Sequence, residues 1–176
     1  DVYMISSRDG GTKWTRPKRL NTDETNAPQF FPAVAVAPDD TVHVMWGDMR
    51  DDAIQTRYHI YYTSSSDQGE TWGFKNEELG LDVGDTRVTD FSTNPNRAFP
   101  DGVFIGDYFG IAASNEDVYM VWADGRLGEY GGFNTKIGFA RKRQVPNPEI
   151  FLSPDAGPGG ETVTVQGFGF QPNITY

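Results

Sequence analysis

One turn-forming octapeptide occurs twice in the sequence, and this repetition constrains the fold more than any other feature. Residues 65–72 read SSDQGETW and residues 7–14 read SRDGGTKW, with Lys13 in the place of Thr71. An aromatic and β-branched run, residues 59–64, precedes the second copy and is typical of a strand. An Asp that accepts turn N–H bonds, followed by a Gly that tolerates positive φ, predicts a hairpin tip. The hairpin is therefore expected to be a repeating unit.

A second repeat links residues 41–50 (TVHVMWGDMR) with residues 117–126 (DVYMVWADGR). Each copy is an apolar strand that ends in W-x-D-x-R, and such recurrence predicts repeated supersecondary units. The complete unit is expected to have four strands, near residues 32–37, 41–47, 57–64 and 85–89. We expect an insertion of about ten residues after Trp72. Two incomplete units flank the complete one, with strands at 1–6 and 16–20 before it and near 108–113, 118–123 and 134–141 after it.

The octapeptides resemble the Asp-box (BNR) repeat of the sialidase-like β-propellers, and the resemblance covers residues 1–145. It implies an all-β partial propeller of about two and a half four-stranded blades. Further blades, from the same or a neighbouring chain, would be needed, because about four to eight blades close a propeller. In this family the Asp holds its turn, and the Trp packs between blades. The residues that the resemblance makes structural are Ser7, Asp9, Gly11, Trp14, Ser65, Asp67, Gly69, Thr71 and Trp72.

The sequence changes character after residue 145. The β-prone segments 149–154 and 162–170 are separated by a Gly- and Pro-rich stretch. They resemble the first strands of an IPT/TIG-like, immunoglobulin-like domain. Residues 146–176 are too few for a complete sandwich of about 100 residues, so we expect only the start of that domain. Asn173 begins an N-x-T sequon and is a candidate glycosylation site.

Composition restricts the partners of the chain. The formal net charge of −10 over 176 residues argues against nucleic acid, because phosphate binding requires clustered Lys and Arg. No apolar run approaches the roughly 18 residues of a membrane span. The absence of cysteine excludes disulfides and cysteine-based zinc sites. No signal peptide is visible and Asp1 falls inside a repeat, so we expect a fragment of a longer protein that is extracellular or on the cell surface.

Candidate binding residues lie in the loops that follow the W-x-D-x-R strands and in the connection between the second and third units. They are Asp48, Arg50, Asp107, Tyr108, Asp124 and Arg126. In one interpretation each Asp–Arg pair is a local ion pair that fixes its loop. In the other, arginine forks hold a polyhydroxyl or carboxylate ligand. Asp48, Asp51 and Asp52 form an acidic cluster that is either a solvated loop or a Ca²⁺ site, and Ca²⁺ is the single cofactor suggested.

These features support three functional hypotheses. The first is a surface propeller that binds a glycan or a protein through its loops. The second is a full-length exo-glycosidase of the sialidase type, for which the resemblance implies an arginine triad, a Tyr nucleophile with a Glu, and an Asp acid/base. The family's Arg-Ile-Pro segment is absent from the sequence, so we assign no catalytic residue. The third is a structural surface or filament component whose open strand edges pair with other chains.

Overall fold

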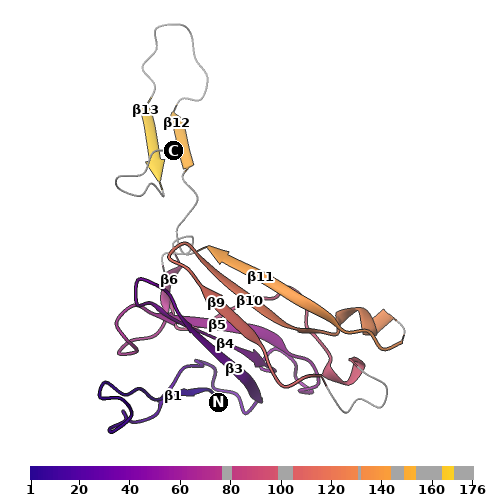
Figure 1. Ribbon diagram of the computed structural model, residues 1–176. Coiled ribbons are helices and arrows are strands. Elements are labelled where there is room, and N and C mark those ends of the chain that lie inside the picture. Colours follow the sequence, from indigo (N-terminus) through magenta and orange to yellow (C-terminus); the bar gives the residue numbers. More distant parts are fainter. Residues whose placement is uncertain (77–80, 99–104, 131, 144–148, 154–163, 169–176) are drawn as a thin grey trace, which may run out of the picture. The chain divides into compact units, whose positions relative to one another are not determined.

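The computed structural model describes residues 1–76, 81–98, 105–130, 132–143, 149–153 and 164–168. The predicted all-β class is confirmed, because the described residues form several antiparallel sheets and none of these sheets closes into a barrel. The chain divides into two compact units, Asp1–Lys142 and Arg143–Tyr176 (Figure 1). Among the described residues, no helix is both long enough and apolar enough to cross a membrane.

The central sheet of the first unit has four antiparallel strands in the order β3-β4-β5-β8. They are β3 (Gln29–Val36), β4 (Val42–Asp48), β5 (His59–Ser65) and β8 (Thr86–Arg87). All four occur where the sequence pattern predicts them. The predicted insertion after Trp72 contains a small hairpin of β6 (Phe74–Asn76) and β7 (Leu81–Val83).

Two further sheets complete the first unit. The strands β1 (Tyr3–Met4) and β2 (Lys18–Arg19) form an antiparallel pair. A three-stranded sheet in the order β11-β10-β9 contains β9 (Gly110–Ala113), β10 (Asp117–Asp124) and β11 (Lys136–Arg143). Short 3-10 helices, η1 (Pro95–Arg97) and η3 (Arg126–Tyr130), lie in the connections near β10. Strand β9 packs beside β3 and β4.

The central sheet buries apolar side chains on both faces because successive residues of a strand point to opposite sides. Trp46 of β4 packs with Val2 and Leu20, which lie next to the paired strands β1 and β2. The adjacent Met45 is fully buried on the other face, where it packs with residues of β10. The residues that form this second cluster are Met45, Tyr58, Ile60, Tyr62, Phe109, Val118, Met120 and Trp122.

The second compact unit contains one described strand pair. Strand β12 (Glu149–Ser153) runs antiparallel to β13 (Thr164–Phe168), with Glu149 opposite Phe168. These strands lie within the two segments that the sequence predicts to be extended. The predicted domain boundary between 145 and 146 and the sequon at Asn173 lie outside the described residues.

Candidate functional site

The second copy of the octapeptide forms a turn that is closed by its own aspartate. Ser65 Oγ donates to Asp67 Oδ1 at 2.8 Å and accepts a bond from the Gly69 N–H at 2.8 Å. The Thr71 N–H donates to Asp67 Oδ1 at 2.8 Å, and Trp72 Nε1 donates to the Gly69 carbonyl at 3.1 Å. The hydroxyl and N–H of Thr71, with the hydroxyl of Ser65, lower the pKa of Asp67 to about 2. The carboxylate is therefore held ionised by the turn that it closes.

The first copy repeats most of this network. Ser7 Oγ donates to Asp9 Oδ1 and accepts from the Gly11 N–H, both at 2.8 Å. The Lys13 N–H donates to Asp9 at 2.8 Å, and Trp14 Nε1 donates to the Gly11 carbonyl at 3.0 Å. Lys13 therefore supplies the backbone bond that Thr71 supplies in the second copy, and it lacks only the hydroxyl bond. Gly11 and Gly69 have φ of +91° and +87°, a region where side chains are strained.

The two tryptophans of these turns differ in their surroundings. Trp72 is half-buried and packs on the cluster that contains Val2 and Trp46. Trp14 is 59% exposed, so no described segment buries it, and its packing between blades stays a prediction. Its ring lies over its own turn, at Gly11, just as the Trp72 ring lies over Gly69.

The two W-x-D-x-R segments also form equivalent turns. Asp48 accepts bonds from the Arg50 N–H at 2.9 Å and from Arg50 Nη2 at 2.7 Å. Asp124 accepts from the Arg126 N–H at 3.0 Å and from Arg126 Nε at 2.5 Å. Asp48 is fully buried and also accepts a bond from Trp46 Nε1 at 2.8 Å. The geometry is that of the local ion pair, the first of the two interpretations.

Arg50 lies at the centre of a cluster that the sequence pattern did not reveal. Its Nη2 lies 3.2 Å from Asp23, 2.7 Å from Asp48 and 3.0 Å from Asp85, and its side chain is only 10% exposed. The guanidinium also lies 4.0 Å from the ring centroid of Tyr61. Burial alone would lower the pKa of Arg50, but the hydrogen bonds that its guanidinium donates to Asp48 and Asp85 raise it. Nη1 also donates to Asp85 at 3.1 Å, so both terminal nitrogens of Arg50 bind aspartates of its own chain.

Arg126 has a different environment, although its turn is the same. Its side chain is 35% exposed, and its Nη1 lies 4.0 Å from Asp90. The guanidinium lies 5.3 Å from the ring centroid of Phe91, which is itself 56% exposed. The hydrogen bond to Asp124 raises the pKa of Arg126. Phe91 was not among the predicted site residues, because an isolated aromatic in a loop carries no local signal.

Asp107 and Tyr108 are exposed, and neither bonds to the two Asp–Arg pairs among the described residues. Tyr108 is 87% exposed. Both residues line a pocket of about 320 Å³ together with Val121 and Ile137 of the β10–β11 sheet. Within the described ranges, no hydrogen bond or ion pair joins Asp107 or Tyr108 to Arg50 or Arg126.

The predicted acidic cluster does not form a Ca²⁺ site. Asp48 bonds to Arg50, whereas Asp51 accepts a bond from Tyr61 Oη at 2.8 Å. Asp52 accepts the backbone N–H groups of its own loop, including that of Thr56 at 2.9 Å. The three carboxylates therefore have different partners, and the described residues contain no group of acidic or histidine side chains that could hold a metal.

Comparison of the chain with protein-family models, with curated proteins and with solved structures finds no match.

Proposed function

We propose that the chain is part of an Asp-box β-propeller that lies outside the cell or on its surface and binds a glycan through the loops after β8 and β10. The pair formed by Arg126 and Phe91 carries this proposal. An exposed ring offers a flat apolar face for a sugar, and a guanidinium donates to hydroxyl or carboxylate oxygens. Asp90, whose side chain is 82% exposed, adds an acceptor beside them.

The comparison of the two equivalent turns supports a role in binding for Arg126. Arg50 is enclosed by three aspartates, whereas Arg126 makes its strong contact through Nε to a single aspartate. The terminal nitrogens of Arg126 therefore lie at the surface next to Phe91. Arg50 only fixes its loop, whereas Arg126 fixes its loop and also places a cation at the surface.

Binding is better supported than an exo-glycosidase of the sialidase type. A sialidase-type site would need arginines with free donors for the substrate carboxylate. Arg50 directs its terminal nitrogens at Asp23, Asp48 and Asp85. Both of its terminal nitrogens already donate to carboxylates of its own chain.

The propeller assignment is supported by the stacking of the sheets. The Trp-bearing face of the central sheet packs on the first sheet, and the Trp-bearing face of β10 packs on the central sheet. Each of the two Asp-box turns is held by the same pattern of internal hydrogen bonds, and the two turns close equivalent hairpins of successive sheets.

A glycan array probed with the 176-residue chain tests the proposal, with calorimetry of any glycan that binds. We expect Phe91→Ala and Arg126→Met each to weaken binding by about tenfold, the equivalent of 1.4 kcal/mol. Arg141→Met is the matched control, because Arg141 is also a half-exposed arginine paired with one buried aspartate, Asp117. The absence of glycan binding, or equal effects of the two arginine variants, would refute the proposal. Release of a fluorogenic sialoside would favour the hydrolase instead.

A further inference from the structure

A second pocket lies between the central sheet and the β9–β10–β11 sheet, away from the proposed glycan-binding residues. It has a volume of about 410 Å³, within the range of small-molecule sites. Its lining residues come from β6, β8, β10 and β11 and the residue after β8: Phe74, Lys75, Thr86, Arg87, Val88, Met120, Ala140, Arg141 and Lys142. Four of the nine are cationic, in a chain whose formal net charge is −10.

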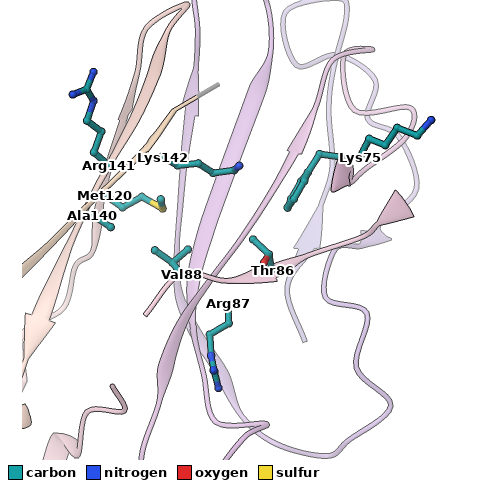
Figure 2. Close-up of a pocket in the computed structure, with 9 residues that line it drawn as sticks. Lys75, Thr86, Arg87, Val88, Met120, Ala140, Arg141 and Lys142 are labelled. Atoms are coloured by element: carbon teal, nitrogen blue, oxygen red, sulfur yellow. The ribbon is translucent and has the colours of Figure 1, made fainter. Parts of the chain in front are cut away.

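Three of these cations are directed out of the pocket. Arg141 forms a two-bond ion pair with Asp117, at 2.8 and 2.6 Å. Arg87 lies 3.5 Å from Asp51, and Lys75 is exposed. In Figure 2 the charged ends of these three side chains point away from the pocket.

Lys142 differs from the other three in both direction and partners. Figure 2 shows its side chain extending across the pocket, above Val88 and Thr86. Its Nζ lies 4.8 Å from the ring centroid of Phe74 and 5.7 Å from that of Tyr62. Across the residues that the structure describes, no hydrogen bond reaches this ammonium and no carboxylate lies within 4.0 Å of it. This half-buried ammonium therefore contacts two aromatic faces and has no counter-ion among the described residues.

We propose that this pocket binds a small organic carboxylate, with its charge on Lys142 and its apolar body against Val88, Met120 and Ala140. The single inward cation matches a single negative charge, and the Thr86 hydroxyl can donate to the second carboxylate oxygen. A phosphate dianion would require more donors than the interior offers. The hydrocarbon side chains of the floor suit a short aliphatic chain or an aromatic ring.

Proton linkage gives this site a distinct signature. Burial lowers the pKa of Lys142 from its ordinary value. A bound anion stabilises the charged ammonium, so saturation should raise the pKa, and affinity should fall as the pH rises through the pKa of the free protein. In the part of the chain that the structure describes, the other titratable side chains around the ammonium are Lys75, Arg87, Arg141, Tyr62 and His43.

Benzoate and its neutral counterpart benzamide are suitable probes, because they share one ring and differ in charge. With ¹³C-labelled lysine and methionine in the 176-residue chain, we expect benzoate to shift the Met120 methyl signal saturably and to raise the pKa of Lys142. Benzamide should bind at least about tenfold more weakly, because the charge-assisted bond is lost. Inorganic phosphate should not displace benzoate.

Two variants distinguish benzoate binding at Lys142 from nonspecific binding to a basic surface. Lys142→Met should weaken benzoate binding by at least about tenfold, whereas Lys75→Met, at the exposed rim, should leave it unchanged. Lys142→Met keeps the length of the side chain and removes its charge, so we expect the variant to fold. Lys142→Gln is a second variant that also removes the charge. Equal binding of benzamide, unchanged affinity in Lys142→Met, displacement by phosphate, or a Lys142 pKa that benzoate does not move would each overturn the proposal. The pKa measurement needs no variant.

Discussion

Replacing Arg50 by Met tests whether the buried cluster holds the loop after β4. The Arg50 side chain is 10% exposed, and the three aspartates that it contacts, Asp23, Asp48 and Asp85, are 6%, 0% and 4% exposed. The variant leaves three buried carboxylates without their cation. Removing one partner of a buried pair costs about 3–5 kcal/mol. Domains are stable by only about 5–15 kcal/mol, so the loss is expected to be about a fifth of the total or more.

The matched control is Arg126→Met, which removes the arginine of the equivalent turn. Arg126 is 35% exposed and strongly contacts one aspartate, so solvent screening reduces the expected loss to about 1 kcal/mol. Urea unfolding followed by tryptophan fluorescence measures both variants, because Trp46 Nε1 donates to Asp48 within the cluster.

The pH dependence of the Arg50→Met variant provides a second measurement. Buried carboxylates without a counter-ion bind protons more tightly than those of the unfolded chain, so the stability deficit should shrink as the pH is lowered from about 7 to about 4. A loss below about 1 kcal/mol, or one equal to that of Arg126→Met, would show that the cluster does not hold the loop. A deficit independent of pH would show that lost packing, and not charge, is responsible.

Three further predictions concern the turns, the strands and the packing of the sheets. Asp67→Asn should lower the melting temperature at pH 7. The difference from the wild type should vanish as the pH falls from 3.8, the ordinary pKa, through about 2, where the wild-type carboxyl is protonated. An NMR titration that finds an ordinary pKa for Asp67 would contradict this prediction. Burial lowers the pKa of His43 below 6.5, so stability should decrease as the pH falls below that value, by at most about 1.4 kcal/mol per pH unit, and urea unfolding of His43→Phe should show a flatter profile. Gly138→Ala places a Cβ 2.2 Å from the Trp122 ring and should cost about 1–3 kcal/mol in urea unfolding, whereas a loss under about 0.5 kcal/mol would mean that the strands shift freely.

Local sequence predicted the parts of the structure whose contacts are local. The Asp67 turn is complete within eight residues, so its residue types define its hydrogen bonds. The same holds for Asp48 and Arg50, whose ion pair spans two residues. The strands were predicted because β-branched and aromatic runs bounded by turn residues favour an extended backbone.

Contacts between distant segments could not be predicted in the same way. Asp23 and Asp85 complete the Arg50 cluster from positions 27 residues before and 35 residues after it, and nothing in their own neighbourhoods distinguishes them from solvated loop acids. The exposure of Trp14 depends on which segment covers it, and the turn itself contains no information on this. The pocket at Lys142 likewise arises only where two sheets meet.

The direction in which the sheets pack distinguishes a repeating array from a two-layer sandwich. In a sandwich each sheet buries one face, so its strands alternate between apolar and polar residues. Strand β4 instead buries both Trp46 and Met45, on opposite faces. The repeat pairs Trp46 with Trp122 and Met45 with Val121, and Trp122 is again 4% exposed while Val121 is 38% exposed. Each tryptophan therefore packs toward the sheet that precedes it in the chain, and a unit that repeats one packing direction builds the stacked or radial array that the propeller proposal requires.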